Sequence, residues 1–315
     1  MERRDARATD AVSFVDRWAT GRPLLLDGAL GTEIERRGGD ARLPLWSARA
    51  LLEDPGLVRR IHCDYAAAGA EVLVADTFRT QSRALARGGL AERAAELTAR
   101  AVGLAREAAA GAPGPCWLAG SAPTLEDCYR PDLVPDEECL RREHAAHAEN
   151  LRSAGVDAVF AETLNTIREA RAATAAARET GLPVVTSFVC GPEARLLSGE
   201  PLAAALDASG EAGALAVGVN CLPPRAVDAC LPVLARSGIP FVVYANLGEP
   251  MADGGFRRTD AGSPEALARE AERWLEAGAG GVGGCCGTTP DHVAALERCV
   301  SIRRGPRTQF ASPRA

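Results

Sequence analysis

Lysine is absent from this sequence. The chain has 315 residues, and all 36 of its basic side chains are arginine. Without lysine the protein cannot form a Schiff base with a carbonyl substrate or with pyridoxal phosphate. It also lacks the lysine that Walker A loops and protein kinases use to hold phosphate. Lysine aldolases, pyridoxal enzymes, P-loop nucleotidases and protein kinases are therefore excluded.

Long apolar runs and basic stretches are absent as well. No segment approaches the roughly 20 apolar residues of a membrane-spanning helix, and residues 1–10 are polar, with no signal-like apolar core. The 42 acidic side chains give a net charge of −6, and no basic patch suggests a nucleic-acid partner. We therefore expect a cytoplasmic protein with no membrane and no nucleic-acid partner, in which the ten cysteines stay reduced.

One short pattern, Ala-Gly followed by apolar residues, occurs four times. Its copies start at Ala68, Ala154, Ala212 and Ala277. Each copy ends an alanine-rich helical pattern with glycine, which is favoured just after a helix, and then begins a buried strand. Four further apolar runs alternate with these copies, at residues 24–27, 117–121, 184–188 and 241–246.

Together these runs predict eight strands, each followed by a helical segment. The predicted helices cover residues 56–68, 82–110, 136–154, 166–180, 200–212, 224–237, 264–277 and 290–302. Continuous apolar runs favour parallel strands that are covered on both faces. We predict the α/β class with a single (β/α)8 TIM barrel over residues 11–302, between flexible segments at 1–10 and 303–315. A doubly wound sheet remains the alternative, because spacing does not separate the two.

The carboxyl ends of the predicted strands carry polar or reactive side chains. In a barrel these ends surround the active site, so they form the list of candidate residues. The list is Asp27, Asp76, Thr77, Ser121, Glu162, Thr163, Ser187, Asn220, Cys221, Asn246, Cys285 and Cys286.

Three of the ten cysteines fall at strand ends. Cys221 follows the sixth strand, and Cys285 and Cys286 follow the eighth, so the three thiols are expected near one another at the barrel mouth. Three thiolates with one open position are typical of a catalytic zinc site. Adjacent cysteines converge only where the strand ends, and the flanking glycines allow this. A redox pair or ordinary buried thiols are the alternatives.

Two other patterns are discounted. Residues 278–283 fit the G-x-G-x-x-G pattern, but they follow a helix and enter a strand, the reverse of the dinucleotide-binding context. His144 and His147 lie three apart among charged residues on a predicted helix, which indicates a solvated face. A histidine-zinc hydrolase or a Ser-His-Asp triad is therefore poorly supported.

Six motifs resemble those of the homocysteine S-methyltransferase family. They lie at residues 26–32, 119–121, 162–163 with 169–170, 218–221, 244–250 and 283–290, the last reading Gly-Gly-Cys-Cys-Gly-Thr-Thr-Pro. The family includes S-methylmethionine:homocysteine methyltransferase and the homocysteine-binding domain of methionine synthase. The resemblance spans nearly the whole chain and implies the same barrel.

The resemblance also implies roles for individual residues. Cys221, Cys285 and Cys286 would hold Zn²⁺ and thereby activate the acceptor thiol. The substrate-binding residues it implies are Asp27 and Glu162 for the ammonium group of homocysteine, the amides of Gly28 and Ala29 for its carboxylate, and Asn220. Zinc deprotonates a coordinated thiol, so no general base is needed.

The implied partners are homocysteine and a small methyl donor. S-methylmethionine is the first donor to consider and S-adenosylmethionine the second, with methionine as the product. The segment 122–131 departs from better-known members where the donor is expected. The alternatives are a methyltransferase for another thiol or selenol, and a non-catalytic barrel that senses zinc or thiols.

Overall fold

The computed structural model describes residues 12–250, 256–258 and 262–304. Eight parallel strands form its centre: β1 (Leu24–Leu25), β2 (Val72–Ala75), β3 (Trp117–Pro123), β4 (Ala158–Leu164), β5 (Val184–Phe188), β6 (Ala216–Asn220), β7 (Phe241–Ala245) and β10 (Gly281–Gly284). Their order in the sheet is β1-β10-β7-β6-β5-β4-β3-β2. A parallel bridge from Leu26 to Val72 joins the two ends. The predicted barrel is confirmed, and a doubly wound sheet is excluded.

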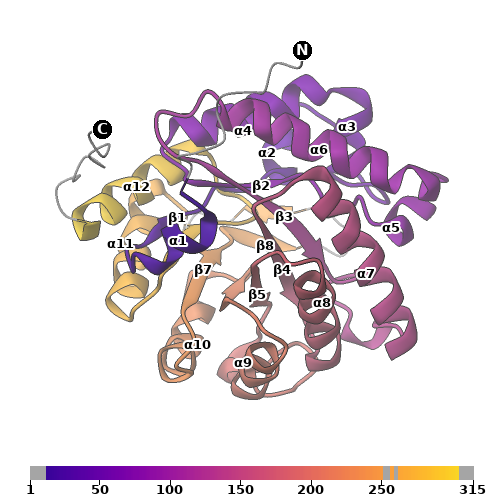
Figure 1. Cartoon of the computed structure of the whole chain (residues 1–315). Coiled ribbons are helices and arrows are strands. Elements are labelled where there is room, and N and C mark those ends of the chain that lie inside the picture. Colours follow the sequence, from indigo (N-terminus) through magenta and orange to yellow (C-terminus); the bar gives the residue numbers. More distant parts are fainter. Residues whose placement is uncertain (1–11, 251–255, 259–261, 305–315) are drawn as a thin grey trace, which may run out of the picture.

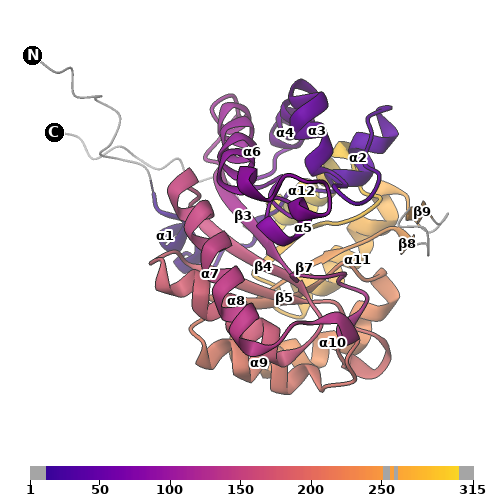
Figure 2. The ribbon, with the colours of Figure 1, turned by 90° about the vertical axis from the view of Figure 1, so that its right-hand side faces the viewer.

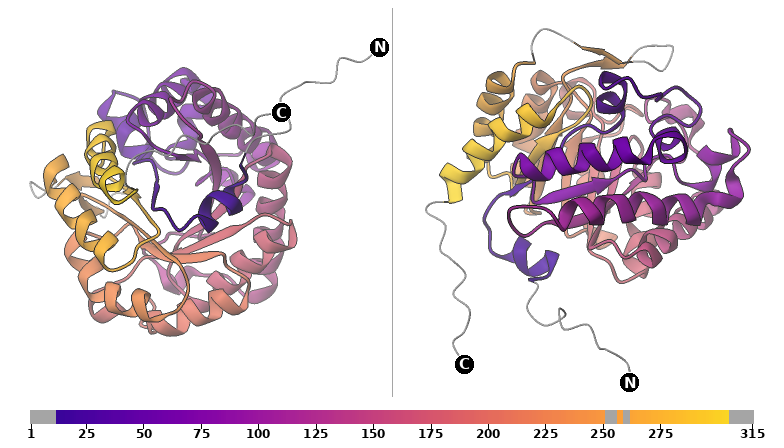
Figure 3. Two further views of the ribbon diagram at one scale, coloured as in Figure 1. Left: turned by 60° about the vertical axis from the view of Figure 1, so that its left-hand side comes forward. Right: turned by 90° about the horizontal axis from the view of Figure 1, so that it is seen from above.

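Helices form a ring around the strands (Figure 1 and Figure 3). The ring contains α4 (Pro55–Ala67), α6 (Ala94–Ala109), α7 (Glu137–Ala154), α8 (Ile167–Glu179), α9 (Leu202–Glu211), α10 (Pro224–Arg236), α11 (Pro264–Glu276) and α12 (Pro290–Arg304). Apart from the start of α6, their ends lie within two residues of the predicted ones. None of the helices in the described residues is both long and apolar enough to span a membrane.

The four repeated Ala-Gly pairs mark helix ends, as predicted. Gly69, Gly155, Gly213 and Gly278 have φ angles of 102°, 81°, 91° and 101°. This left-handed conformation is costly for a residue with a Cβ atom, so glycine ends each helix and turns the chain into the next strand. At the other end of α11, the Ser263 hydroxyl accepts a hydrogen bond from a backbone amide of the first turn, as a cap does.

The barrel interior is a separate apolar cluster. Leu24, Val72, Trp117 and Phe160 belong to it and are buried. Phe14, from the short helix α1 (Phe14–Ala19), joins the same cluster and covers one end of the barrel. Figure 2 shows α1 at one end of the molecule and the hairpin of β8 (Gly248–Pro250) and β9 (Phe256–Arg258) at the other. The end that remains open is the one to which the strands point their carboxyl termini.

The helix predicted over 82–110 is divided. A short helix α5 (Ser82–Ala86) ends before Gly88 and Gly89, and α6 begins only at Ala94. Gly89 has a φ of 71°, which breaks the helical path despite the alanine-rich pattern around it. Two further short helices that the sequence did not indicate, α2 (Gly31–Arg36) and α3 (Ala48–Glu53), lie between β1 and α4.

The last helix of the barrel can be compared with its predicted end. Helix α12 continues two residues beyond the predicted end at Ile302. The Arg304 guanidinium donates to the Pro23 carbonyl and pairs with Glu71, which anchors the end of this helix to the start of β1. The flexible segment predicted at 1–10 lies outside the described residues, and so does the tail from residue 305.

Candidate active site

Nine of the twelve candidate residues line one cavity of about 620 Å³ at the carboxyl ends of the strands. Thr77, Ser187 and Asn246 are buried but do not line it. Asp27, Glu162 and Cys221 reach it from β1, β4 and β6, together with Cys285 and Cys286 from β10. Strand ends are positioned by the hydrogen-bonded barrel, so these side chains have a rigid support. The cavity is in the size range of small-molecule sites.

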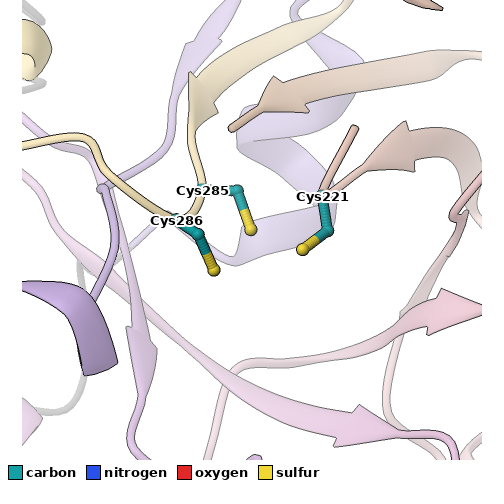
Figure 4. A group of neighbouring side chains, drawn as sticks. All are labelled: Cys221, Cys285 and Cys286. Atoms are coloured by element: carbon teal, nitrogen blue, oxygen red, sulfur yellow. The ribbon is translucent and has the colours of Figure 1, made fainter. Parts of the chain in front are cut away.

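The three strand-end cysteines form a cluster. Their Sγ atoms all lie within 4.8 Å of one another. Figure 4 shows the side chains of Cys285 and Cys286 beside each other and that of Cys221 approaching from the neighbouring segment. None of the ten cysteines forms a disulfide, and the alternative of a redox pair stays a prediction.

Backbone geometry makes the cluster possible. Cys221 has a φ of 57°, which bends the chain directly after β6. The Cys285 amide donates to the Ala245 carbonyl at 2.8 Å, which extends the pairing of β10 with β7. Gly287 has a φ of 86° and turns the chain after the second cysteine. Strained backbone at Cys221 is typical of a functional position.

The protonation of the cluster is asymmetric. Hydrogen bonds from the thiols of Cys285 and Cys286 hold the pKa of Cys221 well below its usual value, and Tyr129 contributes a further hydrogen bond. The same bonds, together with burial, raise the pKa of Cys285. Of the three thiols, Cys221 is therefore the one whose deprotonated form its neighbours favour.

The donor set fits a metal ion. Tetrahedral zinc with sulfur ligands at about 2.3 Å would place the sulfurs about 3.8 Å apart. The thiols of Cys221, Cys285 and Cys286 are already within 4.8 Å of each other and face the cavity. Three protein thiolates leave one position of the tetrahedron for a substrate.

Two buried carboxylates lie in the same cavity. Asp27 accepts a hydrogen bond from the Val74 amide at 2.9 Å, and Glu162 accepts one from the Ser121 hydroxyl. Burial raises the pKa of Glu162 to about 7. Burial also raises the pKa of Asp27 well above its usual value, and repulsion from Glu162 adds to the effect.

These two carboxylates lack a cationic partner among the described residues. No arginine in that part of the chain forms an ion pair with Asp27 or Glu162. Two buried like charges at one place favour binding of a cation, because a cation removes both the desolvation cost and the repulsion. The arrangement can therefore hold an ammonium group.

The other residues predicted to bind substrate are placed differently. The Ala29 amide already donates to the Thr288 hydroxyl at 3.0 Å, whereas the Gly28 backbone lines the cavity. A Cβ atom on Gly28 would lie 2.7 Å from the Tyr65 ring, so only glycine fits there. The roles predicted for the Gly28 and Ala29 amides remain predictions.

Asn220 makes three hydrogen bonds to protein atoms through its side chain. Its side-chain oxygen accepts from the Thr163 amide and the Ser187 hydroxyl, both at 2.9 Å. Its amide nitrogen donates to the Thr163 hydroxyl at 2.9 Å. Thr163 has a φ of 59°, so Asn220 holds this strained residue directly after Glu162. Its predicted contact with substrate stays untested.

The solvated face predicted for two histidines is wrong. His144 and His147 on α7 are each only 3% exposed. His147 contacts the Ser121 carbonyl at 3.0 Å, and His144 contacts Glu169 at 3.3 Å. Both pack against the strands that carry the site, and neither lines the cavity. The charged neighbours misled the prediction, because the buried face of α7 includes the two histidines with few apolar residues.

Several cavity residues were not singled out from the sequence. Trp46 and Phe78 pack edge to face at 5.5 Å between ring centroids, and Arg79 and Tyr129 also line the cavity. Tyr129 belongs to the segment 122–131, which the sequence placed near the donor without assigning a role to any side chain. No local pattern marks the other three.

Comparison with known proteins agrees with this geometry. Residues 24–300 match the family described as Homocysteine S-methyltransferase. The homocysteine S-methyltransferase of Escherichia coli (strain K12) is 33% identical over 87% of this chain and 94% of its own length. The chain belongs to the homocysteine S-methyltransferase family. It is therefore a methyltransferase, which removes the non-catalytic sensor from the alternatives.

Two further relatives bear on the site. The crystal structure of the homocysteine methyltransferase MmuM from Escherichia coli in a metallated form has a TM-score of 0.77 and 32% identity, covering 88% of this chain and 96% of that one. A selenocysteine Se-methyltransferase from Brassica oleracea var. italica is 29% identical over 90% of this chain and 91% of its own. The family thus includes a protein described with metal and one named for a selenol acceptor.

Proposed function

We propose that this enzyme transfers a methyl group from a small sulfonium donor to homocysteine, giving methionine. S-methylmethionine is the first candidate donor and S-adenosylmethionine the second. The observation that supports the proposal is one cavity that combines three clustered thiols with two carboxylates lacking a cation among the described residues. The thiols suit the sulfur atom of the acceptor, and the carboxylates suit its ammonium group.

Cys221, Cys285 and Cys286 would hold the metal, and zinc is the ion that best suits this ligand set. Bound zinc supplies a Lewis acid that keeps the acceptor thiol deprotonated at neutral pH. The lowered pKa of Cys221 favours the deprotonated form that metal binding requires.

The two carboxylates orient the acceptor. Asp27 and Glu162 bind its ammonium group, and the free backbone of Gly28 faces its carboxylate. Held at that end, the acceptor extends its sulfur toward the cysteines. Asn220 acts indirectly, since it holds Thr163 and thereby the end of the strand that carries Glu162.

Methyl transfer then depends on alignment. The acceptor sulfur forms a bond to the methyl carbon while the bond from that carbon to the donor sulfonium breaks. The bonding electron pair returns to the donor sulfur, which leaves as a neutral thioether. No proton moves in this step, so the lack of a lysine or an available histidine in the cavity is no obstacle, and the protein contributes mainly proximity and orientation.

A panel of donors and acceptors tests the proposal. Purified protein with a measured zinc content is incubated with homocysteine and either donor, and methionine is quantified by mass spectrometry. Chelated protein is assayed in parallel, with activity restored by added zinc as the expected result. Turnover that persists in protein shown to be free of zinc would contradict the metal role. Absence of methionine with both donors would contradict the reaction.

A selenol is the second candidate acceptor. It is favoured by the relative named selenocysteine Se-methyltransferase, and a softer selenium atom also suits a thiolate metal site. Competition between homocysteine and selenocysteine under reducing conditions gives the ratio of their kcat/KM values. A ratio near or above one for the selenol would favour this acceptor.

We also place the enzyme in the cytoplasm. Ten cysteines without a disulfide suit a reducing compartment, and a thiol acceptor is stable there. Cell fractionation with antibody detection tests this placement, and recovery of the protein outside the cytoplasmic fraction would contradict it.

A further inference from the structure

One cation in the cavity has no anionic partner. The cavity lining contains two arginines, Arg79 and Arg130. Arg130 is paired with Asp132 through two hydrogen bonds. Arg79 makes no hydrogen bond or ion pair with any residue that the structure describes, and its Nε atom is buried without a partner. Buried guanidinium groups normally have hydrogen-bond partners. Arg79 is therefore placed to bind an acceptor that does not belong to the chain itself.

The two carboxylates whose charge acts on Arg79 are Asp127 and Glu126, and neither forms an ion pair with it. Asp127 accepts a hydrogen bond from the Tyr129 amide at 2.9 Å, and Glu126 pairs with Arg83 and Arg87. Three arginines spaced four apart thus follow β2, and only the first is left unpaired and facing the cavity. Its guanidinium carbon lies 5.7 Å from the centre of the Phe78 ring, a contact that orients the group but does not neutralise it.

A buried carboxyl group with one open oxygen lies three residues before it. Asp76 is 3% exposed and lines the same cavity. One of its oxygens accepts a hydrogen bond from Ser47 at 2.6 Å, whereas Oδ2 is buried with no partner among the described residues. Burial raises the pKa of Asp76 to about 7. The loop after β2 therefore presents one open cation and one open carboxylate oxygen to the cavity.

Arg79 and Asp76 share their cavity with the cysteine cluster. The lining includes Cys221, Cys285 and Cys286. It also includes the 128–129 loop, in which the Tyr129 hydroxyl lies 3.2 Å from the Sγ atom of Cys221. Asp27 and Glu162 line the cavity from the ends of β1 and β4, so it holds charged groups beyond the two that we assign to the acceptor.

We propose that Arg79 and Asp76 form the subsite for the amino-acid end of the methyl donor, with Arg79 binding the donor's carboxylate and Asp76 its ammonium group. This inference rests on the proposed function and names the class of donor: a sulfonium that carries a free α-amino acid. A guanidinium matches a carboxylate through two parallel hydrogen bonds. Anchored there, the donor directs its methyl group toward the acceptor sulfur at the cysteines.

The acceptor is the competing occupant of this subsite. Asp27 and Glu162 offer two carboxylates for one ammonium group, but Asp76 and Arg79 offer one charge of each sign, as a zwitterion requires. A cavity of about 620 Å³ has room for two small amino acids. If the donor occupies the subsite, changing Arg79 should raise the KM of the donor. If homocysteine occupies it, the same change should raise the KM of homocysteine instead.

Binding of donors with and without a carboxylate tests the subsite. Calorimetry on the zinc-loaded enzyme compares S-methylmethionine and S-adenosylmethionine with their decarboxylated analogues. We expect the wild-type enzyme to bind the intact donors about 10- to 100-fold more tightly, the range for a charged hydrogen bond. In Arg79→Gln this preference is lost, with the decarboxylated analogues bound as before, and Arg79→Lys restores it in part.

Matched controls separate this role from a structural one. Arg87→Gln removes an arginine of the same segment that is exposed and paired outside the cavity, and it should leave the carboxylate preference and the zinc content unchanged. In steady-state assays Arg79→Gln should raise the KM of the donor and leave that of homocysteine unchanged. A rise confined to the KM of homocysteine would overturn the proposal.

The binding assay also separates this inference from the proposed reaction. Carboxylate-dependent donor binding that Arg79→Gln abolishes, in an enzyme that makes no methionine, would support the subsite and refute the proposed reaction. Methionine formation from donors that bind equally well with and without the carboxylate would support the proposed reaction and refute the subsite. Failure of both intact donors to bind the wild-type enzyme would overturn the subsite.

Discussion

The hydroxyl of Tyr129 lies 3.2 Å from the Sγ atom of Cys221. Tyr129 belongs to the loop after β3, whereas Cys221 directly follows β6, so this hydrogen bond crosses the mouth of the barrel. It connects the segment that we associate with the donor to the cluster that we associate with the metal. The bond lowers the pKa of Cys221, in addition to the larger effects of Cys285 and Cys286.

Replacing Tyr129 by phenylalanine should therefore make Cys221 less acidic. Loss of one hydrogen bond to a charged group corresponds to a rise in pKa of about one to two units. A pH titration of the thiolate absorbance in metal-free protein measures this rise. Tyr65→Phe is the control, because the Tyr65 hydroxyl donates to the Ala29 carbonyl and not to a thiol. An unchanged titration in Tyr129→Phe would contradict the assignment.

Replacing Cys285 by serine should remove both metal and activity. A hydroxyl is a much poorer zinc ligand than a thiolate, and two remaining thiolates do not complete the site. Metal analysis after purification should fall from about one zinc per chain to far less. Cys63→Ser is the matched control, because Cys63 lies on α4 outside the cavity. This variant protein should keep its zinc. Full activity in Cys285→Ser would show that the metal site is wrongly placed.

Asp27→Asn should weaken the binding of the acceptor selectively. The amide keeps the size of the side chain and can still accept from the Val74 amide, but it no longer attracts an ammonium group. We expect the KM of homocysteine to rise about 10- to 100-fold while the KM of the donor stays the same. Initial-rate measurements with each substrate varied in turn distinguish this result from a general loss of activity.

Glu162→Gln should change how stability depends on pH. The pKa of Glu162 is raised to about 7 in the folded protein, against 4.5 for the free side chain. Between these values the folded state keeps a proton that the unfolded state has lost, so the free energy of unfolding falls as pH rises. The free energy of unfolding of the wild type should fall by about 3 kcal/mol relative to that of Glu162→Gln as pH rises through this range, and the difference should level off about one unit above pH 7.

Denaturant unfolding at several pH values, without substrate, checks this difference. Glu162→Gln should also bind homocysteine less tightly at neutral pH. The Glu162 carboxylate would then lower the stability of the fold but strengthen the binding of homocysteine. A constant difference in unfolding free energy across the pH range would refute the raised pKa.

Much of the fold was predictable because it depends on local chemistry. Glycine is needed at the left-handed ends of helices, and continuous apolar runs suit strands buried on both faces, so Gly69, Gly155, Gly213 and Gly278 locate four of the eight units. The prediction failed at 82–110, where Gly89 interrupts an alanine-rich pattern that local propensity alone would continue.

The candidate site was predictable to the extent that it follows from strand ends. A barrel brings all its carboxyl strand ends together, so Cys221 and Cys285 could be placed near each other although 64 residues separate them. The histidines of α7 were misplaced because burial of a polar side chain depends on partners in distant segments. His147 is satisfied by the Ser121 carbonyl, which no pattern around the histidine reveals.

By itself the sequence determined that this protein has no lysine, that eight β/α units follow one another and that three thiols and two carboxylates stand at strand ends. Only the tertiary structure decided which charges are neutralised. Arg79, Arg83 and Arg87 have equal spacing along the chain, yet Glu126 pairs with the last two and leaves Arg79 open to the cavity. Ion pairing depends on distance in space, which the closure of the barrel sets, and not on distance along the chain.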